Sequence, residues 1–138
     1  MALVKSLAAA LAATVLASPA IADTWPSKPI TLLVPFSAGG PTDFIARLVA
    51  EPLSRELGQQ VIVQNKPGAS GNVGYQSVLN GPADGYTLMH NTVGMQAINP
   101  LMYPSAKMHP LQDYVPVGIT GAMPNLLVVN PERTPVKT

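Results

Sequence analysis

The chain has 138 residues, of which 8 are Lys or Arg and 7 are Asp or Glu, so its formal net charge at pH 7 is only +1. This balance lacks the basic footprint that nucleic-acid binding requires, and nucleic acid is excluded as a partner. The absence of cysteine excludes disulfides and thiolate chemistry. Its 15 prolines and 11 glycines alternate with apolar runs, which is typical of one globular domain with many turns.

The first 22 residues have the composition of an export signal. Lys5 supplies a positive charge, residues 7–17 form an apolar run, and Ala20, Ile21 and Ala22 make an A-x-A cleavage site. The apolar run is short for a membrane-spanning helix, and a retained N-terminal anchor helix is the alternative. We therefore expect a signal peptide at 1–22, cleaved after Ala22, and export to the periplasm.

A strand, a glycine turn and a helix follow one another near the start of the mature chain. Residues 30–34 are a short apolar run of the kind found in a central α/β strand. Gly39 and Gly40 let the backbone turn tightly and let a ligand approach it closely. Pro41 suits the first turn of a helix, and the following Thr42 and Asp43 can cap or charge that turn. The turn contains no Lys or Arg, so the unit predicts an anion site built from main-chain N–H groups.

The helix after this turn is expected to be amphipathic. Its apolar positions have the spacing of one helical face and are Phe44, Ile45, Leu48, Val49, Leu53 and Leu57. Pro52 lies within this pattern and is expected to kink the helix or split it in two. Gly58 is well placed to end it.

The rest of the chain continues the alternation of strands and helices. A second strand is predicted at 61–63, a small-residue turn at 68–72 that leads into a short helix, and a third strand at 86–89. Further strands are predicted at 115–120 and 126–129. This order predicts a mainly parallel α/β sheet flanked by helices. The turns after the first three strands should then meet at the carboxyl edge of the sheet, where such sheets bind ligands.

Six motifs of the mature chain resemble the substrate-binding proteins of tripartite tricarboxylate transporters, also called the Bug family. They occur in the family's order and spacing and are Trp25–Ile30, Val34–Asp43, Leu57–Gln59, Asn65–Gly71, Asp84–Leu88 and Asn99–Pro100. The resemblance implies a type II periplasmic-binding-protein fold, in which two lobes close on a ligand like a Venus flytrap. Residues 23–138 resemble the N-terminal lobe. Family members continue well beyond this length, so we expect a truncated member without the second lobe.

The resemblance also implies a receptor that is not an enzyme and that uses no cofactor or metal. Such a receptor captures a small organic carboxylate and delivers it to the membrane components of a tripartite tricarboxylate transporter. Main-chain amides, hydroxyls and ordered waters hold the ligand in this family. The matching residues are Phe36, Ser37, Ala38, Gly39, Gly40, Thr42 and Asp43 in the first-lobe ligand loop, and Ser70, Gly71 and Asn72 in the neighbouring turn.

Each of these residues also has a purely structural interpretation. Asp43 suits the first turn of a helix whether or not a ligand binds, and it is equally suited to orient a water or a ligand amine. Gly39 and Gly40 are also compatible with close packing of helix on sheet. Ser70 and Asn72 are also compatible with capping of the short helix that follows.

Two other functions are compatible with a strand–glycine turn–helix unit. One is an exported α/β hydrolase or phosphate-handling enzyme, although the chain lacks a P-loop, G-x-G-x-x-G spacing and a G-x-S-x-G nucleophile elbow. His90 and His109 have no flanking carboxylates that would indicate a metal or catalytic site, and Arg47 is interpreted as an ion-pair residue. The other alternative is a non-functional fragment of the receptor. Ligand titration and a hydrolase screen distinguish these possibilities.

Overall fold

The computed structural model describes residues 24–124, 126–130 and 132–133. Three strands form a parallel sheet in the order β2-β1-β3, and they are β1 (Ile30–Val34), β2 (Val61–Asn65) and β3 (Thr87–Met89). The first strand in the chain is therefore the central one. This confirms the predicted α/β class with a parallel sheet.

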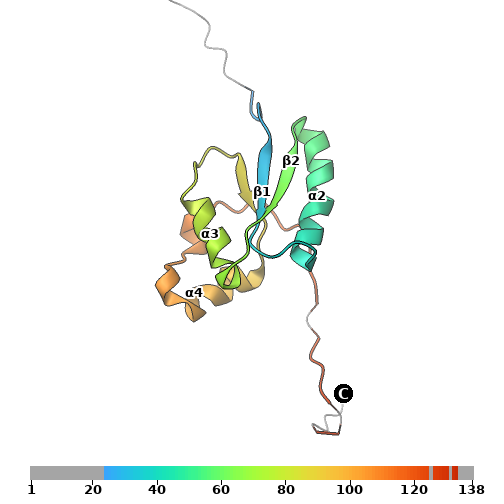
Figure 1. The fold of residues 1–138 in the computed structure, drawn as a ribbon, viewed down its shortest axis with the longest axis vertical. Coiled ribbons are helices and arrows are strands. Elements are labelled where there is room, and N and C mark those ends of the chain that lie inside the picture. The colour runs from blue at the N-terminus through green and yellow to red at the C-terminus, as the bar shows by residue number, and fades with distance from the viewer. Residues whose placement is uncertain (1–23, 125, 131, 134–138) are drawn as a thin grey trace, which may run out of the picture.

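Helices lie on both sides of this sheet (Figure 1). Helix α2 (Pro41–Leu57) connects β1 to β2, and helix α3 (Asn72–Leu79) connects β2 to β3 on the opposite side. The two connections run in opposite directions across the sheet, so right-handed crossovers place their helices on opposite faces. The shorter helical elements are η1 (Ala69–Gly71), η2 (Gly94–Ile98), α4 (Asn99–Met102), η3 (Pro104–Ala106) and α5 (Pro110–Asp113).

The hydrophobic core has two parts. The first part joins β1, β2 and α2 through Ile30, Leu32, Val34, Ala46, Ala50 and Val61. The second part joins α3 to the turns after β3 and consists of Tyr75, Met95 and Met108. Phe36, the first residue of the predicted ligand loop, packs against both parts. The loop is therefore anchored at the point where the two parts of the core meet.

Helix α2 begins and ends at the expected residues. Pro41 is the first helical residue, and Gly58 ends the helix in the left-handed region with φ +65°. The expected split at Pro52 is wrong, because the helix continues through this residue. Proline removes the hydrogen bond to the carbonyl of Leu48, and its ring crowds that carbonyl. Both residues are exposed, so water can satisfy that carbonyl.

The predicted apolar face of α2 is wrong in part. The helix packs on the sheet through the small residues Ala46 and Ala50, and Leu53 extends this contact. Phe44 and Leu48 are instead 62% and 58% exposed. Alanines bring the helix axis close to the sheet, and the larger apolar residues then lie on the flank of the helix.

The two strands predicted near the C-terminus are not formed. Residues 115–120 and 126–129 have no strand structure, and Val115, Val117 and Ile119 are each more than 85% exposed. A strand requires a neighbour that satisfies its N–H and C=O groups, and no described strand pairs with these segments. Figure 1 shows this part of the chain leaving the folded body beyond α2.

The predicted signal peptide, residues 1–22, lies outside the described residues. Within the described part of the chain, no helix combines the length and the apolar character that crossing a bilayer demands.

Candidate functional site

The carboxyl ends of all three strands lie at one edge of the sheet. In the parallel register, Val34 of β1 pairs with Asn65 of β2, and Leu33 pairs with Met89 of β3. Backbone hydrogen bonds continue past the strand ends, because the N–H of Lys66 donates to the Val34 carbonyl at 2.8 Å. The loop after β1 and the turns after β2 and β3 therefore start at the same edge, as predicted from the sequence.

The loop after β1 leads directly into an open helix N-terminus. Gly40 is the N-cap of α2, and no side chain caps the helix. The first intrahelical bond runs from Phe44 N–H to the Gly40 carbonyl at 2.9 Å. The N–H groups of Thr42 and Asp43 consequently have no acceptor within the helix. Helix N-termini of this kind favour anions, because the N–H groups and the helix dipole act together.

The two glycines of this loop are surrounded by open space. A Cβ added at Gly39 would have no heavy atom within 4 Å, and one at Gly40 would meet only the Ser37 carbonyl oxygen at 3.5 Å. The alternative that this pair serves close helix–sheet packing is therefore wrong. Gly74 of α3 has that role, because its Cβ would lie 2.7 Å from the Cβ of Pro35.

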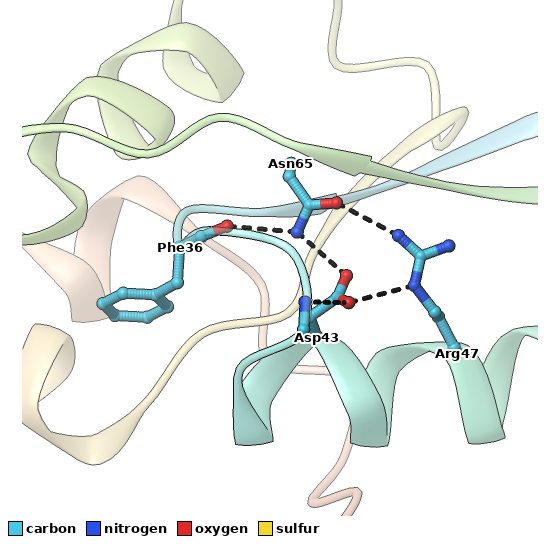
Figure 2. A network of polar contacts seen from close by, with 5 residues as sticks. Phe36, Asp43, Arg47 and Asn65 are labelled. Atoms are coloured by element: carbon cyan, nitrogen blue, oxygen red, sulfur yellow. Dashed lines mark hydrogen bonds and ion pairs between the residues drawn. The ribbon is translucent and has the colours of Figure 1, made fainter.

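Asp43 ties the loop, α2 and β2 together (Figure 2). Its carboxylate accepts hydrogen bonds from Arg47 Nε at 3.0 Å, Gly39 N–H at 2.9 Å and Asn65 Nδ2 at 2.9 Å. The Asn65 amide also donates to the Phe36 carbonyl at 3.0 Å and accepts from the Arg47 guanidinium at 3.1 Å. Arg47 is thus an ion-pair residue, as expected: its ion pair with Asp43 lies within α2, and its hydrogen bond to Asn65 connects α2 to β2. Sequence reasoning did not single out Asn65, although it ends a strand at this edge.

The charge of Asp43 is compensated within this network. The hydrogen bond from Arg47, followed by those from Gly39 and Asn65, holds the pKa of the Asp43 carboxyl well below its usual range. The same contact raises the pKa of Arg47. Asp43 is only 3% exposed, so its structural role is well supported, and a role in orienting a ligand or water stays a prediction.

The turn after β2 has an unusual backbone. Gly68, Ala69, Ser70 and Gly71 all have positive φ angles, of +142°, +45°, +57° and +94°. The N–H of Gly71 donates back to the Gly68 carbonyl at 2.9 Å. A Cβ added at Gly71 would lie 2.6 Å from the sulfur of Met95. This turn therefore requires glycine at both of its ends.

The side chains of this turn contact the region of α4. Asn99 Nδ2 donates to the Ser70 carbonyl and to Asn72 Oδ1, both at 2.9 Å. The Ser70 hydroxyl lies 3.0 Å from the Tyr103 hydroxyl. Gly71 is the N-cap of α3, without a side-chain bond, so the alternative that Ser70 or Asn72 caps this helix is wrong.

The turn after β3 contains a buried histidine. His90 is 9% exposed, its Nε2 lies 2.7 Å from the Thr120 hydroxyl, and its buried Nδ1 has no partner among the described residues. Burial lowers the pKa of His90. Within the described ranges, no three His, Asp or Glu side chains are grouped so that they could hold a metal ion.

Four of the ten predicted site residues lie on an open surface, whereas Asp43, Gly71 and Asn72 are buried. Two hollows of about 290 and 330 Å³ lie between α2 and β2 and between η2 and α5, and none of the ten predicted residues lines either of them. Ser37, Ala38, Gly39 and Ser70 are instead exposed. The two predicted segments leave the same edge of the sheet, and the Asn65 contact with Phe36 connects the first loop to the strand that precedes the second.

Comparisons with known proteins identify the family. The family model of the tripartite tricarboxylate transporter family receptor matches residues 45–138. Protein BugT of Bordetella pertussis is 42% identical over 118 residues, which are 85% of this chain and 36% of that protein. The chain thus spans little more than a third of the length of this curated relative.

Solved structures show the same similarity. MatC from Rhodopseudomonas palustris with bound malate is 33% identical and has a TM-score of 0.65, over 67% of this chain and 32% of its own. An R. palustris protein with adipate is 44% identical and has a TM-score of 0.60, over 63% of this chain and 29% of its own. The matched family model covers more than half of the chain, and the chain therefore belongs to the tripartite tricarboxylate transporter receptor family.

Proposed function

We propose that this chain is the ligand-capturing lobe of a periplasmic receptor for small organic carboxylates. The receptor delivers its ligand to the membrane components of a tripartite tricarboxylate transporter. The loop Phe36–Asp43 holds the carboxylate, and the turn Ser70–Asn72 lies beside it. The observation that carries this proposal is the open, uncapped N-terminus of α2 at the carboxyl edge of the sheet. The malate and adipate in the two similar structures support this class of ligand.

The loop binds the anion through main-chain dipoles rather than through a cation. The N–H groups of Ser37 and Ala38 donate to no acceptor in the described backbone. Hydrogen bonds from such groups to a carboxylate contribute about 1.5–3 kcal/mol each. Arg47 does not supply the counter-charge, because its guanidinium bonds Asp43 and Asn65.

The hydrolase alternative receives no support from the arrangement of the described residues. Ser70 pairs with the hydroxyl of Tyr103, and the Nε2 of His90 pairs with the hydroxyl of Thr120. A nucleophilic serine requires a base within hydrogen-bond distance, and that base is oriented by a third group. We therefore favour a receptor over an enzyme.

The proposal includes export and a division of the chain. Residues 1–22 act as a signal peptide that is removed after Ala22, and residues 23–138 form the N-terminal lobe. A second lobe supplies the other wall of the ligand site. Membership of a transporter receptor family supports the periplasm as the compartment.

The decisive experiment is calorimetric titration with malate and adipate. It compares the mature receptor with its second lobe, called here the full-length mature protein, with its Gly40→Val variant. Gly40 has φ −80°, which any residue adopts, and an added Cβ finds space there, so the fold should persist. The valine side chain then stands at the mouth of the loop. We expect a loss of affinity of about tenfold or more, equivalent to at least one hydrogen bond.

Gly118→Val is the matched control, because an added Cβ there would have no heavy atom within 4 Å, and the one at Gly40 meets only an ordinary contact with the Ser37 carbonyl oxygen at 3.5 Å. It should bind as the wild type does. Unchanged affinity in Gly40→Val would show that the ligand binds elsewhere. Hydrolysis of p-nitrophenyl acetate by a wild-type protein that binds neither acid would favour the enzyme alternative.

A further inference from the structure

We propose that Asn99 and Tyr103 are positioning residues for Ser70. One residue holds the Ser70 carbonyl and the other its hydroxyl, and together they fix how the turn after β2 presents Ser70 to a carboxylate. This inference rests on the proposed function, and it extends the site to a segment that the sequence did not assign to it.

The backbone of the turn requires such support. Ala69 and Ser70 are consecutive residues with φ +45° and +57°. This left-handed region is unfavourable for residues that carry a Cβ. Strained conformations persist only where the surrounding structure holds them, and they are frequent in ligand-binding loops.

Asn99 stabilises the strained turn through two hydrogen bonds from its buried side chain. Its side chain is 8% exposed, and both hydrogens of its amide are used, one for the Ser70 carbonyl and one for Asn72 Oδ1. If Ser70 left the left-handed region, its carbonyl would move away and the buried amide of Asn99 would lose an acceptor, which is unfavourable in itself. Asn99 therefore favours the left-handed conformation of Ser70.

Tyr103 controls the hydroxyl of the same serine. The Tyr103 N–H donates to the Asn99 carbonyl at 2.8 Å, so Tyr103 and Asn99 lie one helical turn apart and face the same side. A phenol that donates to Ser70 Oγ leaves the serine hydrogen free to point at an anion. It also polarises that hydroxyl, which strengthens the bond that the serine then donates.

Ser70 keeps hydrogen-bonding capacity for a ligand. The N–H of Gly71 is used by Gly68, and Asn72 Oδ1 is used by Asn99. Ser70 is exposed, and its hydroxyl can donate one bond and accept two. The contact with Tyr103 uses only one of these.

The test combines calorimetric titration of the full-length mature protein with malate and adipate and thermal unfolding of the same samples. Tyr103→Phe should lower affinity about fivefold, as expected for one hydrogen bond, with the melting temperature unchanged. Tyr86→Phe is its matched control, because the Tyr86 hydroxyl bonds Ser27 near the opposite edge of the sheet, and it should leave affinity unchanged. Asn99→Leu should lower affinity about tenfold or more, whereas Asn80→Leu at an exposed position should not.

Rescue separates positioning from general destabilisation. Ala69→Gly removes the penalty for positive φ at the neighbouring residue, so it should restore most of the affinity lost in Asn99→Leu. Normal affinity in both Tyr103→Phe and Asn99→Leu, or failure of the rescue, would overturn the inference.

A ligand-free measurement distinguishes failure of this inference from failure of the proposed function. If the wild type binds neither acid, the proposed ligand class is wrong, and amide hydrogen exchange decides the inference. Asn99→Leu should then lose protection at Gly71, with β1 unchanged, and Ala69→Gly should restore it. Unchanged protection at Gly71 in Asn99→Leu would refute a positioning role.

Discussion

Three glycines near the proposed site provide a graded test of the loop geometry. Gly40 has a negative φ and open space for a Cβ, Gly39 has φ +82° and open space, and Gly71 has φ +94° and a Cβ position 2.6 Å from the sulfur of Met95. Alanine substitution therefore separates the cost of backbone strain from the cost of steric overlap. The three variants add the same methyl group in three different settings.

The expected changes in the free energy of unfolding follow from these settings. Gly40→Ala should be neutral or stabilising by about 0.4–1 kcal/mol, because it restricts only the unfolded chain. Gly39→Ala should cost about 1–2 kcal/mol, the price of a left-handed residue with a Cβ. Gly71→Ala should cost that amount plus about 1–3 kcal/mol for overpacking against the buried Met95.

Urea unfolding of the mature protein, followed by circular dichroism, measures these differences. The m-value should stay constant across the series, so that shifts in the midpoint report stability alone. Equal losses in Gly39→Ala and Gly71→Ala would refute the reasoning, because the overlap with Met95 would then have no effect. A loss in Gly40→Ala as large as that in Gly39→Ala would show that φ does not decide the outcome.

Three further predictions concern charge, surface and export. The folded-state pKa of Asp43 lies below its ordinary value of 3.8, so Asp43 stabilises the fold above that pH and this contribution is lost as the pH falls through the folded-state pKa. Asp43→Asn should flatten the acid limb of a stability–pH curve measured by urea unfolding, and an unchanged limb would contradict the network. We expect the exposed apolar side chains of Phe44 and Leu48 to promote self-association. Replacing both by serine should reduce it in sedimentation velocity, and unchanged association would place the contact elsewhere. Mass spectrometry of the periplasmic fraction should show a mature N-terminus at Asp23, and an intact Met1 would contradict cleavage.

Local patterns predicted the part of the fold that local physics determines. The apolar run of β1, Pro41 at the start of α2 and Gly58 at its end each act within a few residues, and all three are confirmed. The meeting of the strand ends at one edge follows from the parallel alternation of elements. The strand–turn–helix unit is therefore readable without knowledge of tertiary contacts.

Contacts between distant residues account for what the sequence could not predict. The side of α2 that packs on the sheet is determined by Ala46 and Ala50, whose small side chains carry little weight in a hydrophobic pattern. The apolar residues of 115–120 have the composition of a strand, but a strand also needs a pairing partner. Asn99 lies 29 residues from Ser70 in the chain, and no spacing rule connects them.

The exposed position of the proposed site limits what this surface can do by itself. A carboxylate held by two or three hydrogen bonds gains about 0.5–1.5 kcal/mol from each, or up to about 3 kcal/mol where charge assists. Association costs about 4 kcal/mol or more in lost translational and rotational freedom. The difference leaves the described residues with millimolar binding at best, because Ser37 and Ser70 leave their ligand open to water. Strong capture therefore requires a second surface that removes the ligand from water and so strengthens the same main-chain hydrogen bonds. In the proposed function, the open N-terminus of α2 orients the carboxylate, and closure of that second surface retains it.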